Sequence, residues 1–165
     1  MAVEIMRLLP DFPQVREYLS WMAQGYIFAL TEEMKNSSLR HVRRVEPDRV
    51  NEIYSLLSQL VQVPDKACLL IAHNQSELMG YFLGFLKDCL AETPAQIGYV
   101  NGLYVLPPFR RQQVAQQLIE NGLEWFRSKN ISLIELYITQ GNQTATELWK
   151  KNGFFATDTV FMKTI

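Results

Sequence analysis

The stretch that decides the fold is Val100-Asn101-Gly102-Leu103-Tyr104-Val105-Leu106-Pro107-Pro108-Phe109-Arg110-Arg111-Gln112-Gln113-Val114-Ala115-Gln116-Gln117-Leu118. Its first part belongs to a β-branched and aromatic run, from Ile97 to Leu106, that predicts a strand. Pro107-Pro108 ends this strand, because proline cannot donate to a strand ladder. Apolar residues then recur at helical spacing, which predicts a helix with one buried stripe: Ala115, Leu118, Ile119, Gly122, Leu123 and Phe126.

The turn between the predicted strand and helix favours an anion. A strand that leads directly into a helix leaves unpaired backbone N–H groups at the helix start. The hexamer Arg110-Arg111-Gln112-Gln113-Val114-Ala115 adds two guanidinium groups beside them, and guanidinium groups suit phosphate oxygens. A diphosphate would therefore fit. An ordinary turn with solvated arginines would account for the hexamer equally well, because short motifs often match by chance.

Two motifs in this chain resemble those of the GNAT superfamily of N-acetyltransferases. In that family, an acetyl-CoA loop of the form Arg/Gln-x-x-Gly-x-Gly/Ala follows a strand that ends in Leu-Tyr-Val-x-Pro. Leu103-Tyr104-Val105-Leu106-Pro107 matches the strand end, and Arg110 and Ala115 match the loop. Downstream, the segment from Asn142 to Phe154 is similar to the family's Asn-x-x-Ala-x-x-Leu-Tyr-x-x-x-Gly-Phe signature. The resemblance extends from about Glu4 to the C-terminus and is strongest from Tyr99 to Phe154.

The second motif also has the features of a short helix. Thr144 and Glu147 are spaced to form a capping box, Lys150 and Lys151 suit the negative helix end, and Gly153 would end the helix.

The resemblance implies a single domain, residues 1–165, that binds acetyl-CoA as its cosubstrate and uses no metal. It also implies that the pantetheine arm lies between two diverging strands, where Gly102 would permit a bulge. The residues expected to bind the cofactor are Leu103, Tyr104, Val105, Arg110, Arg111, Gln112, Gln113, Val114, Ala115, Asn142 and Trp149.

Gln113 departs from the family pattern, which has glycine at this position. If the loop holds a diphosphate through its backbone amides, we expect Gln113 to have an ordinary helical conformation and to point its side chain away. Replacing it by glycine would then cost about 0.5–1 kcal/mol through backbone entropy.

Two further departures concern proton transfer. Many family members have Glu at the position of Asn101 and Tyr at the position of Trp149, and neither present side chain ionises near neutral pH. The nearest substitutes are Tyr99, expected on the same strand face as Asn101, and Tyr137 on the next strand. Two hypotheses remain open: an N-acetyltransferase that acts on a small-molecule or peptide amine, and a non-catalytic acyl-CoA-binding module on the same fold.

The composition of the chain excludes several other classes. With 165 residues and 48% hydrophobic content, the chain can bury a full core. A net charge of −1 argues against a nucleic-acid-binding protein, and no stretch suits a membrane span. The N-terminal residues lack the features of a signal peptide, so we expect a cytoplasmic protein, either a monomer or a homodimer. The two cysteines, Cys68 and Cys89, and the two histidines form no metal-ligand pattern, and Cys68 lies in an apolar run that would keep its thiol inert.

The remaining pattern predicts an α/β (α+β) fold with a mixed, mostly antiparallel sheet of about six to seven strands and about four helices, in the order β-α-α-β-β-β-α-β-α-β-β. The further strands are expected at Val3 to Leu9, Ala67 to His73, Leu78 to Leu86, Leu133 to Thr139, and in a hairpin of Phe154 to Ala156 with Val160 to Lys163. The further helices are expected at Phe12 to Tyr26 and from Pro47 to Pro64.

The segment from Tyr26 to Val45 predicts no clear element. It begins a basic cluster that consists of Arg40, His41, Arg43, Arg44 and Arg49. A solvated surface is the simpler interpretation of this cluster, and a site for an anionic acceptor is the alternative.

Overall fold

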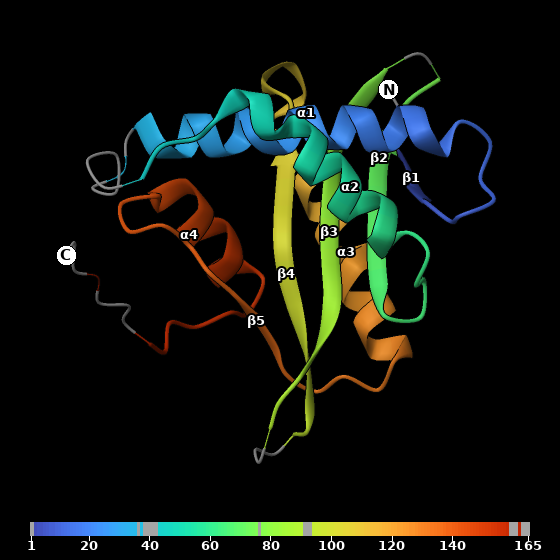
Figure 1. Cartoon of the computed structure of the whole chain (residues 1–165). Coiled ribbons are helices and arrows are strands. Elements are labelled where there is room, and N and C mark those ends of the chain that lie inside the picture. Colours follow the sequence, from blue (N-terminus) through green and yellow to red (C-terminus); the bar gives the residue numbers. More distant parts are fainter. Residues whose placement is uncertain are drawn as a thin grey trace.

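A computed structural model describes residues 2–35, 37, 43–75, 77–90, 94–158 and 162. Its centre is one five-stranded sheet in the order β1-β2-β3-β4-β5 (Figure 1). Neighbouring strands are antiparallel except β4 and β5, which are parallel. The strands are β1 (Glu4–Arg7), β2 (Ala67–His73), β3 (Leu78–Asp88), β4 (Gln96–Val105) and β5 (Ile134–Leu136).

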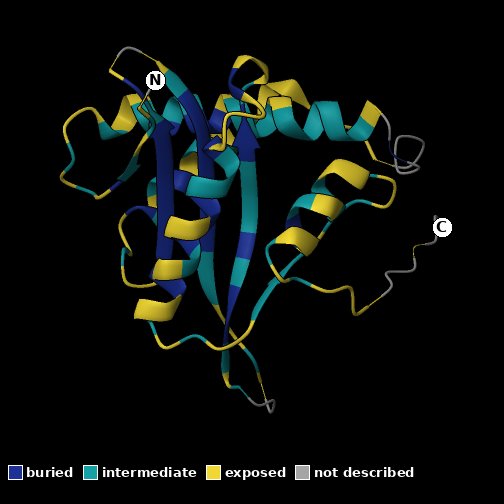
Figure 2. Cartoon of the chain, turned by 180° about the vertical axis from the view of Figure 1, so that it is seen from behind, coloured by how far each residue is buried: buried dark blue, intermediate teal, exposed yellow. Residues whose placement is uncertain are grey.

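The helices cover both faces of the sheet. They are α1 (Val15–Lys35), α2 (Val50–Leu60), α3 (Val114–Ser128) and α4 (Gln143–Lys151), with short 3₁₀ turns η2 (Pro47–Arg49) and η3 (Pro107–Phe109). Helix α3 packs on one face, and α1 and α2 pack together on the other (Figure 1). The buried residues lie along the central strands and the inner helix surfaces (Figure 2).

Alternation along the central strands produces two separate cores. On β3, Phe82 packs toward α3, whereas Tyr81 and Leu83 pack toward α1 and α2. Because successive side chains of a strand point to opposite faces, a continuous apolar run such as β2 supplies both cores at once. The predicted α+β class, helix number and mixed sheet are confirmed.

The number of strands is lower than predicted. Phe154 to Ala156 has no regular structure, and Phe155 is 78% exposed. Most of the second half of the predicted hairpin, Val160 to Lys163, lies outside the described residues. A strand needs a hydrogen-bonded neighbour, so the aromatic residues of Phe154 to Ala156 are not sufficient to form a strand.

Helix α1 is longer than predicted and continues through much of the segment that the sequence left unassigned. It begins at Val15 and ends at Lys35. Within this extension, the Thr31 hydroxyl donates to the Ile27 carbonyl at 2.8 Å, a local bond that is compatible with a continuing helix. The C-terminal half of α1 lies beside β4, the strand whose end carries the first motif (Figure 1). Of the basic cluster, Arg40 and His41 lie outside the described residues, and Arg49 pairs with Glu52 on the surface.

Candidate active site

Strand β4 carries a bulge at the centre of the candidate site. Leu83 of β3 faces Gly102, and the next residue, Gly84, faces Val100, so Asn101 is the extra residue on β4. The parallel ladder with β5 ends at Val100 and Leu136, one residue before the bulge. Because a bulge bends its strand and leaves the extra residue unpaired, β4 diverges from β5 beyond this point. The bulge that the sequence predicted near Gly102 is confirmed.

A cleft of about 170 Å³ lies at this divergence. Five segments form its walls: the second half of α1, Tyr81 of β3, the bulge of β4, the end of β5 with the chain that follows it, and the inner face of α4. The lining residues are Tyr26, Ala29, Leu30, Glu33, Tyr81, Val100, Asn101, Gly102, Leu103, Leu136, Tyr137, Ile138, Asn142, Ala145, Leu148 and Trp149. The cleft thus includes Leu103, Asn142 and Trp149 of the predicted cofactor residues and Asn101 and Tyr137 of the predicted catalytic residues.

The loop between η3 and α3 exposes a run of backbone amides. Among the described residues, the N–H groups from Arg111 to Gln116 have no hydrogen-bond partner, and the first intrahelical bond runs from Gln117 to Gln113. Arg111 and Gln113 both have left-handed backbones, with φ of 62° and 63°. Such a run of free amides at a helix start suits the oxygens of a diphosphate, so the residues of this loop fit the group that the sequence predicted there.

The conformation predicted for Gln113 is wrong. It has φ 63° and ψ 8°, which is the left-handed region, and it precedes α3 as its N-terminal cap. The difference has a physical reason: the helical pattern predicts a helix that has already begun at this position, whereas the chain makes a tight turn at Gln113 before α3 begins. Glycine adopts this conformation without steric cost, so glycine would suit the backbone that Gln113 has here.

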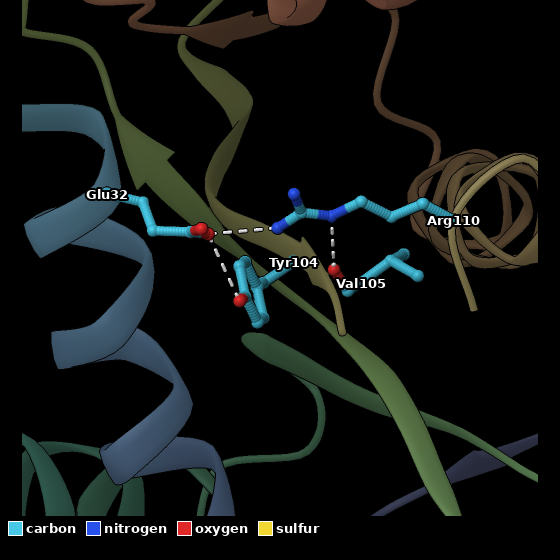
Figure 3. Close-up of polar contacts among 4 residues, drawn as sticks. All are labelled: Glu32, Tyr104, Val105 and Arg110. Carbon is cyan, nitrogen blue, oxygen red and sulfur yellow. Dashed lines mark hydrogen bonds and ion pairs between the residues drawn. The ribbon is translucent and has the colours of Figure 1, made fainter. Parts of the chain in front are cut away.

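Arg110 does not extend freely from the loop. Its Nε donates to the Val105 carbonyl at 3.0 Å, and its Nη2 donates to Glu32 Oε2 of α1 at 2.9 Å (Figure 3). The Tyr104 hydroxyl donates to the same carboxylate oxygen at 3.2 Å. Burial and the Glu32 carboxylate raise the pKa of Tyr104 to about 12, so this phenol is a donor at neutral pH. Arg110 therefore ties α1 to the end of β4, and its other guanidinium nitrogen faces no partner among the described residues.

Helix α4 supplies one wall of the cleft. Asn142 caps it, because its Oδ1 accepts the Ala145 N–H at 3.1 Å, and the helix begins at Gln143. The capping box predicted for Thr144 and Glu147 is therefore wrong, because Asn142, the first residue of the motif, is the N-cap of α4. Trp149, 6% exposed, packs edge-on against Phe154 with ring centroids 5.0 Å apart.

The predicted proton-transfer residues are only partly brought together. Asn101 Nδ2 lies 3.4 Å from the Tyr26 hydroxyl, while Tyr137 borders the cleft and is 68% exposed. Tyr99 packs between Phe85 and Tyr137, with centroids 5.2 and 5.9 Å away, and is not among the residues that line the cleft. Burial, with a smaller effect of Tyr137, raises the pKa of Tyr99, so its phenol stays protonated at neutral pH.

Sequence reasoning missed the contribution of α1. One face of α1 lines the cleft with Tyr26 and with the residues three, four and seven positions after it, which are Ala29, Leu30 and Glu33. The adjacent Glu32 forms an ion pair with Arg110. The helical spacing of Tyr26 to Glu33 was a readable signal, but no pattern in α1 indicates which strand it will face.

The described residues contain no helix long and apolar enough to cross a membrane and no cluster of three or more His, Cys, Asp or Glu side chains that could hold a metal ion. Cys68 is fully buried, and desolvation raises the pKa of its thiol to about 12, so the thiol is not a nucleophile at neutral pH.

The fold is shared with many solved acetyltransferase structures. A predicted acetyltransferase with acetyl-CoA from Clostridium acetobutylicum superimposes with a TM-score of 0.75 at 14% identity, over 99% of this chain and 96% of that one. A GCN5-related N-acetyltransferase from Ralstonia eutropha JMP134 gives 0.72 at 16% identity, over 99% of both chains. An aminoglycoside acetyltransferase from an uncultured soil metagenomic sample gives 0.69 at 18% identity, over 100% and 99%. At identities of 14–18%, the structural similarity shows that these proteins and this chain have the same fold.

The sequence itself carries the family assignment. The model of the acetyltransferase (GNAT) family matches residues 28–154, which include the bulged strand, the amide loop and α4. This match spans well over half of the chain. The chain belongs to the acetyltransferase (GNAT) family.

Proposed function

We propose that the protein is an N-acetyltransferase that moves the acetyl group of acetyl-CoA to a primary amine of a small molecule or peptide, by direct attack in a ternary complex. One observation carries this proposal: a single strand, β4, bears both the bulge that opens the cleft and, at its end, the loop with the free amides. A diphosphate held by the loop would direct its attached thioester arm along β4 toward the bulge.

The cleft supplies groups suited to acyl transfer. The amine nitrogen would attack the thioester carbon, forming a C–N bond and breaking the C–S bond. A backbone N–H left unpaired by the bulge would stabilise the developing oxyanion by about 3 kcal/mol. Asn101 cannot take up a proton at neutral pH, so it would orient a water that removes the amine proton. Tyr137 borders the cleft and would protonate the departing thiolate, with Tyr99 behind it.

Ligand-dependent thermal unfolding tests the proposal. Acetyl-CoA at about 100 times its dissociation constant should stabilise the protein by about 2.7 kcal/mol. For a chain of this length, the midpoint temperature should rise by about 5–10 °C. 3′-Phosphoadenosine 5′-diphosphate, which lacks the pantetheine arm, is the matched probe for the diphosphate and adenosine part alone. The absence of a shift with millimolar acetyl-CoA would refute the proposal.

A non-catalytic acyl-CoA-binding module is the second candidate, because the family resemblance implies Glu and Tyr at the positions of Asn101 and Trp149, and neither present side chain ionises near neutral pH. Thiol release with a panel of amines separates the two candidates. The panel should include an aminoglycoside, since one structural neighbour is an aminoglycoside acetyltransferase. For the enzyme, release should exceed background hydrolysis with at least one acceptor and should increase with pH as the amine loses its proton. Acetyl-CoA binding without amine-dependent release would favour the module.

A further inference from the structure

One stripe of α1 forms a complete wall of the cleft. It consists of Tyr26, Ala29, Leu30 and Glu33, which share one helix face because they are three, four and seven residues apart. Three of these side chains are aromatic or aliphatic, and the fourth is a carboxylate. Glu33 is partly buried and lies two turns beyond Tyr26, about 10 Å along the helix axis.

Glu33 gives the cleft its charge. Of the residues that line the cleft, it is the one acidic residue, and the lining contains no Lys, Arg or His. The neighbouring carboxylate, Glu32, is occupied by Arg110 and Tyr104 outside the cleft. A carboxylate in a partly desolvated cleft without a basic partner attracts a cation from the ligand, because Coulomb attraction is weakly screened there.

The Glu33 side chain is held in place from the opposite wall. Its Oε1 accepts the backbone N–H of Thr139, which follows β5, at 3.3 Å. Its other oxygen, Oε2, carries no hydrogen bond or ion pair within the described part of the chain. One oxygen therefore fixes the carboxylate across the cleft, and the other is available to a ligand.

The far end of the stripe marks the reacting end of the cleft. The Tyr26 hydroxyl lies 3.4 Å from the Asn101 amide at the bulge, where the proposed function places the attacked thioester. A ligand that reaches from this point to Glu33 needs a chain of several carbons between two polar groups. The apolar side chains of Ala29 and Leu30 would line that chain.

We propose that Glu33 is a specificity-determining residue that binds a second ammonium group of the acceptor, so that the preferred acceptor is a diamine or polyamine with its two amines separated by an aliphatic chain. This inference rests on the proposed function, since it takes the bulge as the reacting end. In this arrangement one amine lies uncharged at the bulge, while the other remains protonated against the free Glu33 oxygen.

Matched amines test the inference. Cadaverine and pentylamine have the same five-carbon chain and differ by one ammonium group, and 5-aminopentanoate replaces that group with a carboxylate. We expect kcat/KM from thiol release to be at least about tenfold higher for cadaverine than for pentylamine, as for a charge-assisted hydrogen bond, and lowest for 5-aminopentanoate. Calorimetric titration of cadaverine and pentylamine into CoA-saturated protein should show the same order of affinity.

Variants of Glu33 separate charge from structure. Glu33→Gln keeps an oxygen that can accept the Thr139 N–H but removes the charge, so it should abolish the preference for cadaverine, mainly through KM, and leave the acetyl-CoA thermal shift unchanged. Glu33→Asp should retain part of the preference. Glu147→Gln, an exposed change on α4, is the control and should retain all of it.

Several results would overturn the inference. They are equal values for cadaverine and pentylamine in the unmodified protein, no measurable binding of cadaverine, or a preference that survives in Glu33→Gln. Loss of the preference together with the acetyl-CoA shift would also overturn it, because the role of Glu33 would then be structural. A missing acetyl-CoA shift in the unmodified protein, while cadaverine still binds more tightly than pentylamine in a titration without CoA, would refute the proposed function alone.

Discussion

Replacing Gln113 by glycine should stabilise the protein, the opposite of what the sequence predicted. Gln113 has φ 63° and ψ 8°, a left-handed backbone that costs a residue with a side chain roughly 1–2 kcal/mol. Glycine has no such cost. It does, however, give the unfolded chain more freedom, which offsets about 0.4–1 kcal/mol of the gain. The expected net change is an increase of about 0.5–1 kcal/mol in the free energy of unfolding.

The neighbouring residues provide matched controls. Arg111 also has a left-handed backbone, with φ 62°, so Arg111→Gly should give a gain of similar size. Gln112 does not, and its side chain donates to the Pro108 carbonyl at 2.9 Å. Gln112→Gly should therefore destabilise the protein, by about 1 kcal/mol, through lost backbone restriction and a lost hydrogen bond. Gln113→Ala truncates the side chain but keeps the strained conformation, so it should give no gain.

Urea unfolding measures all four variants. The midpoint should increase for Gln113→Gly with an unchanged slope, which attributes the change to stability. Calorimetric titration should show an affinity for CoA equal to or higher than that of the parent, because the loop amides remain in place. A loss of stability in Gln113→Gly as large as that of Gln112→Gly would refute the assigned backbone conformation. A large loss of CoA affinity would show that the glutamine side chain itself contacts the ligand.

Three further substitutions test the core, the buried phenol and the loop charge. Gly122→Ala should lower the free energy of unfolding by about 1–3 kcal/mol in urea, because a Cβ there would lie 2.4 Å from the Phe82 ring. Folding raises the pKa of Tyr104 to about 12, so the stabilisation from this protonated phenol is complete below about pH 10 and is lost as the pH rises toward about 12. Tyr104→Phe should reduce this loss of stability at alkaline pH. Urea unfolding at about pH 8 and about pH 11 measures it. Arg111→Ala should weaken CoA binding, with less difference from the parent at high salt, in calorimetric titrations at two ionic strengths.

The sequence predicted those parts of the site that are local in the chain. The strand, the loop and the helix from Gln96 to Ser128 follow one another directly, so propensity, proline positions and helical period were sufficient. Asn142 and Trp149 could be placed because they lie on one short helix with a recognisable motif. In each case the residues that decide the structure are close neighbours in sequence, and the family resemblance supplied the expectation that they bind the cofactor.

Contacts between distant segments could not be predicted in this way. Glu32 meets Arg110 across 78 positions, and Glu33 meets Thr139 across 106. No local pattern reports such partners, because they depend on how α1 crosses the sheet. The backbone of Gln113 was missed for a different reason: glutamine favours helical φ and ψ, and the surrounding turn overrides that preference.

The two adjacent carboxylates of α1 connect the two sides of the proposed reaction. Successive helical residues point about 100° apart, so Glu32 and Glu33 reach different partners from one turn of the helix. Glu32 holds Arg110, which begins the amide loop, and Glu33 holds Thr139, which follows β5. The end of α1 is thus fixed to both chain segments that border the gap between β4 and β5. A phosphate that drew Arg110 away from Glu32 would loosen one of these two connections, so cofactor binding and the position of Glu33 in the cleft should be energetically coupled.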